Sequence, residues 1–443
     1  MKRITSAILL IAMLNLCACQ QVPSNSDKNT NKTVTTSNTT AQSVVLTKPK
    51  TLTLRNHIQL KAQELNSSQL CTEYNNNYYL PKILGTYKSK IFFLDSNCSA
   101  DDKTKHIGVY DFKSGIINRL AVNDIEMDLM GQNNLILDEE HFVYAYVVWP
   151  EHPTNERKIK LIMCDFSKKP KFETLAELKL TPQYTQIEKL NEEELAIFFH
   201  MSSFEGEKRR EIYIYNLKLK KFTKIYSETG DTKTVDAKLT YACSCYGGKI
   251  HLLMHQSKDG KFKTFIRTLD KNAKKVGEFE LTAISGYGSP DETVRSMLFD
   301  GDLIFLDWTK LYFDGKKTKR TVPECVVLQK TNDSSSYQVL DTSKFELGLP
   351  NCHHRQKDEP YIFRSSLASL DPNKKASYFA FYPEDSAIDI LTSSFNSPFA
   401  VINQHFPADS TSNASDKVQT VFIQKVEKKL NKNQMMAHYY LEK

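Results

Sequence analysis

Polar, titratable side chains end four apolar runs of this chain at matching positions, to within one residue. They are Asp95, His200, His255 and Asp307. Carboxylate and imidazole groups bind polar ligands and metal ions, and they transfer protons. If the four runs lie side by side, we expect the four side chains to share one rim and to form a ligand-binding ring. The plainer interpretation, that a buried segment simply ends where polar residues begin, stays open.

Planar and basic side chains follow the same runs. Trp149 and Trp308 are the two tryptophans, and basic clusters occur at 208–210 and 316–320. A basic rim that carries aromatic rings would suit an anionic glycan, a teichoic-type polymer or an acidic partner protein. A solvated loop surface with a modest charge bias is the alternative.

Motifs for catalysis are absent from the sequence. It contains no G-x-S-x-G, S-x-x-K, H-E-x-x-H, P-loop or G-x-G-x-x-G pattern. Cys352, His353 and His354 are consecutive, and neighbours in an extended chain point to opposite sides, so we do not assign them to one metal ion. We therefore expect no metal and no cofactor. A hydrolase that acts on a glycan or lactone through an axial Asp/His site remains the alternative function.

A repeat of about fifty residues positions these side chains. Each unit has an extended run, a polar turn, a very apolar run, a polar loop and a further hairpin. The markers of the apolar runs are Ile91, Phe142, Leu195, Ile250 and Leu303, at intervals of 51, 53, 55 and 53 residues. Four strands at this period are typical of a β-propeller, in which each blade covers the apolar face of its neighbour.

The fold class predicted is therefore all-β, a seven-bladed β-propeller over residues 51–443, with six or eight blades as alternatives. A sixth unit spans 360–402, and only two strands, 418–426 and 434–441, remain after it. We expect the chain's N-terminal strands, within 51–65, to complete the ring, because a closed ring leaves no exposed sheet edge. Two β-sandwiches are the competing fold, and a helix within 51–84 is not excluded.

The segment 107–115, Ile-Gly-Val-Tyr-Asp-Phe-Lys-Ser-Gly, continues with Ile-Ile-Asn-Arg-Leu120. This phrase resembles the outer hairpin of TolB-like and related extracytoplasmic propellers of bacteria. The resemblance covers the blades, supports the fold, and carries no site residue across.

The N-terminus begins with Lys2 and Arg3, followed by an apolar stretch from Ile4 to Leu16 and then Cys17-Ala18-Cys19. This pattern is typical of a secretory signal. Leu16-Cys17-Ala18-Cys19 resembles the lipobox of bacterial lipoproteins, which implies a signal peptide over 1–18 and lipidation of Cys19. Residues 19–50 are rich in Ser, Thr and Asn, and we interpret them as a disordered tether.

Composition restricts the partners. The net charge is +7 and 25% of the residues are charged, which favours a folded body near an anionic surface and gives no argument for nucleic acid. Seven of the nine cysteines lie beyond Cys19. Of these, Cys243 and Cys245 share one face of a strand and are interpreted as packing residues, while a bridge from Cys71 to Cys98 stays open.

These observations together predict a lipid-anchored protein on the extracytoplasmic side of the cell envelope. The membrane is its partner through the lipid, and the loops of one propeller face form a binding or assembly scaffold for an envelope polymer or protein. A role in outer-membrane assembly is a further possibility that depends on the host.

Overall fold

The computed structural model describes residues 46–65, 72–74, 77–79, 81–96, 105–122, 133–148, 158–180, 182–202, 207–231, 238–258, 261–281, 292–314, 317–331, 337–342, 360–364, 377–392, 400–406, 417–428 and 432–441. Side chains at some strand ends lie outside this description. All of these residues belong to one compact unit, 41–443. Among them no helix is long and apolar enough to cross a bilayer. The predicted signal peptide and Cys19 lie outside the described residues.

Four sheets are built from consecutive strands that pair antiparallel as meanders. The first contains β6 (Lys82–Tyr87), β7 (Lys90–Ser96), β8 (Lys105–Asp111) and β9 (Ile117–Val122). The second contains β10 (Asn134–Ile136), β11 (His141–Val148), β12 (Lys158–Asp165) and β13 (Lys171–Leu178). The third contains β14 (Tyr184–Lys189), β15 (Glu194–Ser202), β16 (Glu207–Asn216) and β17 (Lys221–Asp231). The fourth contains β18 (Lys238–Tyr246), β19 (Lys249–Lys258), β20 (Lys261–Leu269) and β21 (Lys275–Glu280).

Three further sheets each include one strand from the N-terminal segment. β22 (Glu292–Asp300), β23 (Leu303–Asp314), β24 (Lys317–Lys330) and β25 (Tyr337–Asp341) are joined by β1 (Leu46–Thr51). β26 (Tyr361–Arg364), β27 (Ser377–Tyr382) and β28 (Ala387–Thr392) are joined by β2 (Thr53–Gln59). β29 (Ala400–Phe406), β30 (Lys417–Lys428) and β31 (Lys432–Leu441) are joined by β3 (Lys61–Leu65). A small hairpin pairs β4 (Thr72–Tyr74) with β5 (Asn77–Tyr79).

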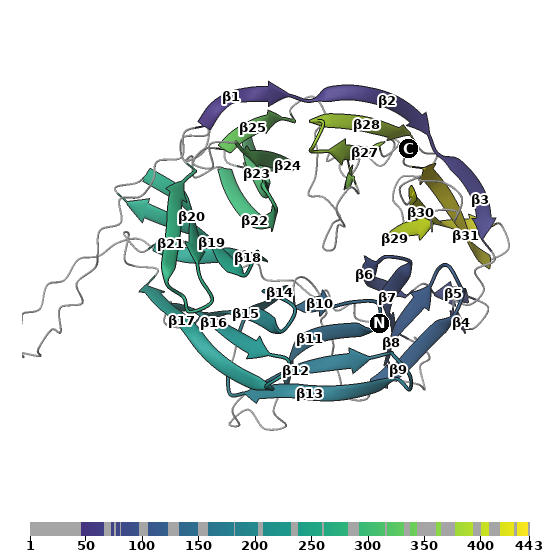
Figure 1. Ribbon diagram of the computed structural model, residues 1–443, viewed down its shortest axis with the longest axis horizontal. Helices are drawn as coiled ribbons and strands as arrows, with labels where there is room; N and C mark the ends of the chain where they lie inside the picture. The colour runs from purple at the N-terminus through teal and green to yellow at the C-terminus, as the bar shows by residue number, and fades with distance from the viewer. Residues whose placement is uncertain are drawn as a thin grey trace, which may run out of the picture. The chain divides into compact units, whose positions relative to one another are not determined.

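The sheets pack face to face in chain order, as Figure 1 shows. Five apolar clusters each combine side chains of two successive sheets, from β6–β9 through to β26–β28. β29 lies against β6 and β7, so the last sheet meets the first. This is the arrangement of a β-propeller, because an isolated sheet that is apolar on both faces is stable only between two neighbours. The all-β propeller fold is therefore the fold of the described residues.

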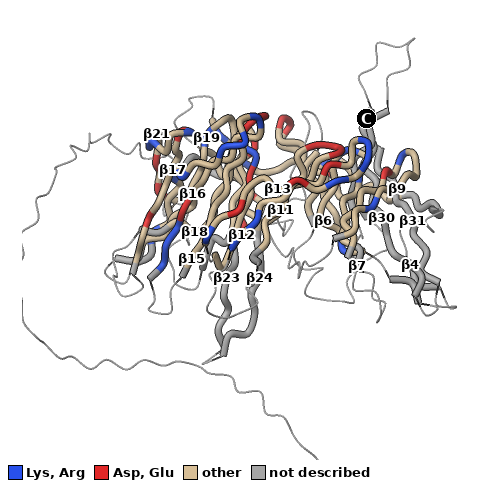
Figure 2. The backbone as a smooth tube through the Cα atoms, turned by 90° about the horizontal axis from the view of Figure 1, so that it is seen from below, with Lys and Arg blue, Asp and Glu red and all other residues tan. Residues whose placement is uncertain are grey.

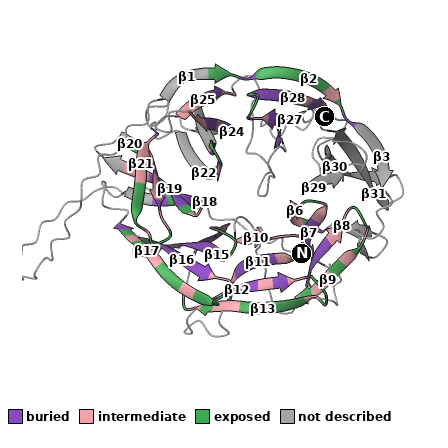
Figure 3. Cartoon of the chain, in the orientation of Figure 1, coloured by how far each residue is buried: buried purple, intermediate pink, exposed green. Residues whose placement is uncertain are grey.

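The repeat markers occupy equivalent places in the fold. Each is the first or second residue of the second strand of its sheet, and each is at most 4% exposed. Figure 3 shows these second strands buried and the outer strands β9, β13 and β17 partly exposed. The fifty-residue period therefore reflects one buried strand in each sheet.

The strand count differs in detail from seven blades of four strands. Six sheets have four strands, and the sheet of β22–β25 has five because it takes up β1 in addition to its own four. β29, assigned from the sequence to the sixth unit, instead begins the last sheet, and β2 completes the sheet of β26–β28. β1 begins at Leu46, so the last residues of the segment interpreted as a tether form a strand. Residues 72–74 and 77–79 are strands, and so are 53–59 and 61–65, within the region where a helix was left open.

Candidate functional site

The two ends of the sheets have different chemistry. At one end, here the turn end, short turns join the first strand of a sheet to the second, and the third to the fourth. At the other, the loop end, the second strand leads toward the third, through residues such as 203–206 that lie outside the description. Asp95, His200, His255 and Asp307 all occupy the part of their strands nearer the loop end.

Three of these four side chains can be described, and all three are partly buried. His200 lies in β15, His255 in β19 and Asp307 in β23. Asp95 lies in β7, where its Cα pairs with that of His106, but its side chain is outside the description. The same holds for the side chain of Trp308 in β23, and Trp149 lies outside the described residues.

His200 belongs to a row of polar residues that crosses all four strands of its sheet. The backbone register aligns Tyr184 with His200, His200 with Arg210, and Arg210 with Glu228. Aligned residues of neighbouring strands project on the same face of a sheet. The row Tyr184–His200–Arg210–Glu228 faces the sheet of β18–β21, because Phe198 and Ile212, two residues further along on the same face, pack against β18 and β19.

Arg210 is the buried cation of this row. It is 3% exposed, and its Nε donates to the carbonyl of Thr240 in β18 at 3.0 Å, while Nη1 donates to the carbonyls of Met201 at 3.4 Å and Arg209 at 3.3 Å. Burial lowers the pKa of Arg210 to about 10, against the opposing influence of Glu228. The guanidinium remains charged at neutral pH and joins the loop ends of two neighbouring sheets.

His200 is held neutral beside this cation. Burial, and then the charges of Arg210 and Lys208, lower the pKa of His200 to about 4. A neutral imidazole has one donor and one acceptor nitrogen, which suits a polar ligand. Glu228 stabilises the far end of the row, because it accepts hydrogen bonds from the Thr240 amide at 2.5 Å and the Tyr226 hydroxyl at 2.6 Å.

His255 and Asp307 have neighbours in their own sheets. Nδ1 of His255 lies 3.1 Å from Oγ1 of Thr264, and the His255 ring meets the exposed Tyr241 ring edge-to-face with centroids 5.1 Å apart. Asp307 lies close enough to Cys325 to contribute, after burial, to the raised pKa of that thiol. The three predicted residues thus occupy three successive sheets at the same end, and a single ring formed by all four remains a prediction.

A second polar cluster, which the sequence did not reveal, lies on the first strand β14. Nε2 of Gln186 donates to Oε1 of Glu188 at 2.7 Å and to the carbonyl of Cys243 at 2.5 Å, and Oε1 of Gln186 accepts from the Cys243 amide at 3.3 Å. Burial raises the pKa of Glu188 to about 7. The signal in the sequence, alternating polar residues over 184–189, also fits an ordinary half-exposed strand, so it does not single out this carboxyl group.

The described cysteines are unpaired thiols and serve packing. Cys164, Cys243 and Cys325 are buried, and Cys245 is partly buried. Burial raises the pKa of each thiol, which keeps it protonated and poorly nucleophilic at neutral pH. Cys71, Cys98 and Cys352 lie outside the described residues.

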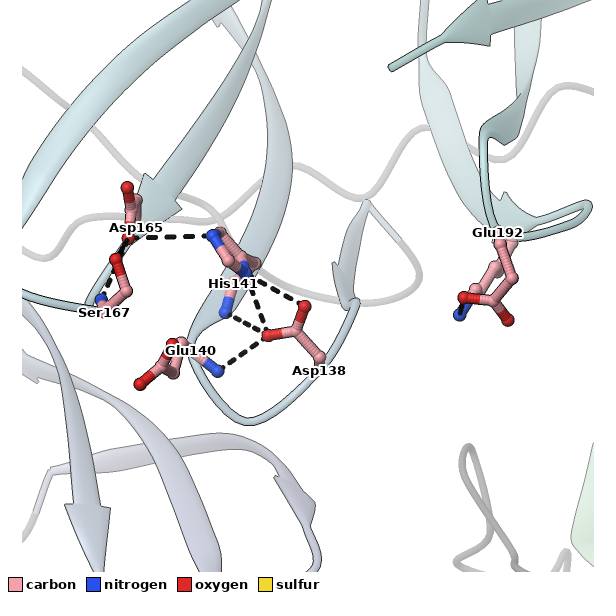
Figure 4. Close-up of polar contacts among 7 residues, drawn as sticks. Asp138, Glu140, His141, Asp165, Ser167 and Glu192 are labelled. Carbon is pink, nitrogen blue, oxygen red and sulfur yellow. Dashed lines mark hydrogen bonds and ion pairs between the residues drawn. The ribbon is translucent and has the colours of Figure 1, made fainter. Parts of the chain in front are cut away.

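The turn end is held together by side chains that bind their own turns. In Figure 4, Asp138 accepts hydrogen bonds from the amides of Glu140 at 2.8 Å and His141 at 2.9 Å, and Asp165 accepts from the amide and hydroxyl of Ser167. His141 lies between the two carboxylates, with Nδ1 2.9 Å from Asp138 and Nε2 3.6 Å from Asp165. The hydrogen bonds from Ser167 contribute most to the lowered pKa of Asp165, about 2.

The same use of a carboxylate or amide oxygen recurs around the turn end. Each acceptor begins a turn and receives the amide two residues further on. These acceptors are Asp111, Asp138, Asp165, Asn191, Asn216 and Asp270. The acidic runs 138–140 and 192–194 lie in such turns, as the sequence indicated, and their role is structural.

Among the described residues, no group of three His, Cys, Asp or Glu side chains has the geometry of a metal site. A small cavity between the sheets of β10–β13 and β14–β17 is lined by apolar side chains, including Ile159, Leu178 and Phe199. It is a packing void without a polar group to orient a ligand.

No protein-family model matches this sequence, and the comparison with curated proteins finds no significant match. Among solved structures, the chain is similar to an acylaminoacyl peptidase of Pyrococcus horikoshii at 12% identity and a TM-score of 0.43, with 79% of this chain and 51% of the peptidase covered. It is similar to the β-propeller domain of the Trilobed protease from Pyrococcus furiosus at 9% identity and a TM-score of 0.43, covering 84% and 95%.

A third similar structure is the polysaccharide lyase Uly1, at 10% identity and a TM-score of 0.46, covering 88% of this chain and 97% of the lyase. The chain thus spans about half the length of the peptidase. The class of protein defined here is the β-propeller, and it rests on the sheet topology of this chain.

Proposed function

We propose that this protein is a lipid-anchored envelope protein of the TolB-like kind, whose loop end binds an anionic envelope polymer or protein as a scaffold. The lipobox-like Leu16-Cys17-Ala18-Cys19 supports the anchor, with Cys19 as the lipidated residue on the extracytoplasmic side. A single acyl chain gives only marginal membrane binding, whereas two or more give stable attachment.

The observation that carries the binding role is the polar row at the loop end. It places a buried cation, Arg210, beside a neutral imidazole, His200, at the end of a propeller sheet. His255 and Asp307 occupy comparable places in the next two sheets. Positive charge with half-buried hydrogen-bonding groups favours an anionic, hydroxyl-rich ligand. The turn end, in contrast, uses its polar groups to hold its own turns.

Binding of defined polymers to the full chain tests this role. We expect polygalacturonate or polyglycerol phosphate to bind, neutral dextran not to bind, and added salt to weaken the interaction because exposed charges are screened. The double variant His200→Ala/His255→Ala should bind at least tenfold more weakly. Glu139→Ala/Glu192→Ala, at the turn end, is the matched control and should bind as the unmodified chain does. Equal binding by both variants, or binding of neutral dextran, would reject the proposal.

One observation favours the alternative, a hydrolase. The carboxyl group of Glu188, on an innermost strand and with a pKa raised to about 7, has the protonation behaviour of a general acid. Turnover of a glycan or lactone library, lost in Glu188→Gln or in Asp307→Ala/His255→Ala, would replace the scaffold by an enzyme. The absence of turnover by the intact chain would leave the scaffold as the function.

A further inference from the structure

The turn end is itself divided between an inner and an outer set of turns. Inner turns, which join the first and second strands of a sheet, carry the acidic segments 138–140, 192–194 and 300–302. Outer turns join the third and fourth strands of the four consecutive-strand sheets. Their segments are 111–116, 165–172, 216–222 and 270–276, and they contain ten lysines against three aspartates. Figure 2 shows both kinds of charge along this end of the molecule.

Each outer turn also exposes one large apolar side chain. The exposed fractions are 59% for Ile116, 38% for Phe172, 71% for Leu219 and 51% for Val276. One such residue on a surface needs no explanation, but the same feature in four successive sheets defines a pattern. The outer turns therefore alternate apolar and basic side chains along the rim.

Most of the charge in the outer turns is available to a partner. Lys171, Lys220 and Lys275 form ion pairs with Asp165, Glu173 and Glu278. The other lysines have no ion pair within the described part of the chain, and they are Lys113, Lys168, Lys169, Lys218, Lys221, Lys271 and Lys274. The three aspartates accept hydrogen bonds from the amides of their own turns, from Lys113, Ser167 and Asn272.

We propose that the four outer turns form a surface that docks on an anionic lipid bilayer. Lysines near an anionic bilayer are attracted to its headgroups, and exposed apolar side chains such as Leu219 enter the boundary between headgroups and acyl chains. An anionic polymer in water would satisfy the lysines alone and would leave the four apolar side chains exposed. The combination of both residue types on one rim therefore fits a lipid surface.

This docking gives the body an orientation that an anchor alone would not give. The 27 residues from Cys19 to Leu46 span up to about 90 Å when extended. A tether of that length would let either end of the propeller meet the membrane. With the outer turns on the bilayer, the loop end faces away from it. The inference concerns the opposite end from the proposed polymer site, and does not depend on that site.

The test uses the full chain carrying Cys19→Ala, so that no lipid is attached at residue 19. It measures sedimentation with vesicles of phosphatidylglycerol and phosphatidylcholine, and with vesicles of phosphatidylcholine alone. The test variant replaces four exposed outer-turn lysines by serine: Lys169, Lys218, Lys221 and Lys274. A control of equal charge replaces four exposed lysines elsewhere: Lys50, Lys179, Lys249 and Lys263. The N-terminal apolar segment is common to all these chains and cancels in the comparison.

We expect the outer-turn variant to bind the anionic vesicles at least tenfold more weakly, and the control variant to stay within twofold of the parent chain. Leu219→Trp should show a blue shift of its fluorescence on addition of anionic vesicles and none with phosphatidylcholine alone. An equal loss in both serine variants would show a response to net charge and would overturn the proposal. So would unchanged binding of the outer-turn variant, or an emission of the Leu219→Trp variant that does not respond to the lipid.

Discussion

The four sheets from β6 to β21 and the three from β22 to β31 solve the problem of the outer sheet edge in different ways. In the first group each sheet is complete after four consecutive strands, and its outermost strand has no further partner strand. In the second group the N-terminal belt, residues 46–65, adds one strand to each sheet. The comparison shows that a propeller can combine local repeats with a long-range seal, at the cost of ordering a segment far away in sequence.

The two groups also differ in how polar residues are used. In the consecutive-strand sheets, polar side chains mainly bind their own turns. In the belt, Arg55 reaches Asp389 of β28 through Nε at 3.3 Å and Nη2 at 3.0 Å, and Asn56 donates to the same carboxylate at 3.0 Å. The guanidinium also lies 4.0 Å from the centre of the Tyr382 ring. Asp389 is 1% exposed, so the belt supplies the cation for a buried carboxylate.

Removal of that cation should have the largest effect. We expect Arg55→Met to destabilise the protein by about 3 kcal/mol, because breaking a buried ion pair leaves an uncompensated charge. Urea denaturation followed by circular dichroism measures the loss. Arg55→Met/Asp389→Asn is the control, and it should recover part of the stability. A loss below about 0.5 kcal/mol for the single variant would mean that the belt is not held by this contact.

A buried histidine at the junction of the two groups should give a pH dependence of similar size. The His251 ring stacks on Phe299 with centroids 3.7 Å apart, and burial lowers its pKa to about 4. The unfolded chain, with a histidine pKa near 6.5, binds the proton first as the pH falls. Stability should therefore be lost from pH 6.5 down to 4, by up to about 3 kcal/mol for this residue. His251→Gln should flatten the profile of unfolding free energy against pH in that window, and an unchanged slope would contradict the assignment.

Within the consecutive-strand sheets, tight packing sets the next effect. A Cβ added to Gly108 would lie 2.2 Å from Cζ of Phe93, whose ring is fully buried. Overpacking of this kind costs about 1–3 kcal/mol. Gly108→Ala should lower the midpoint of urea unfolding accordingly, while Gly277→Ala, where the nearest atom is 3.9 Å away, should have little effect. If both substitutions are equally tolerated, the close contact at Gly108 does not exist.

The smallest effect is expected for an exposed ion pair between two consecutive-strand sheets. Lys88 and Glu139 meet at 2.5 Å, but their side chains are 42% and 40% exposed. Solvated pairs contribute about 0–1 kcal/mol. Lys88→Ser should change the unfolding free energy by less than about 0.5 kcal/mol at moderate salt. A change comparable to that of Arg55→Met would remove the distinction between the two groups.

The predictability of each group from sequence follows from the same difference. The markers Ile91 to Leu303 could be recognised because every second strand needs a run of residues buried on both faces. The belt could not be recognised in full, because β2 is largely exposed and its sequence, TLRNHIQ, is polar. Pairing through the backbone leaves no pattern of side chains to read, so Leu46–Lys50 were taken for a tether.

The candidate site divides along similar lines. His200 was found because a titratable residue ends an apolar run, which is a local signal. Arg210 and Glu228 join it only through strand register, and Glu188 acquires its raised pKa only through burial against β18. Such properties arise from pairing between strands, and a one-dimensional pattern does not contain them.

Hydrogen exchange of the belt tests the central claim most directly. In the full chain, amides of 53–59 should exchange slowly, as those of 387–392 do, because β2 pairs with β28 and the Thr53 amide bonds to the Ser386 carbonyl at 3.0 Å. Arg55→Met should accelerate exchange in both segments and leave that of 82–122 unchanged. Exchange of 53–59 at the rate of an unstructured peptide, beside a protected 387–392, would contradict the account.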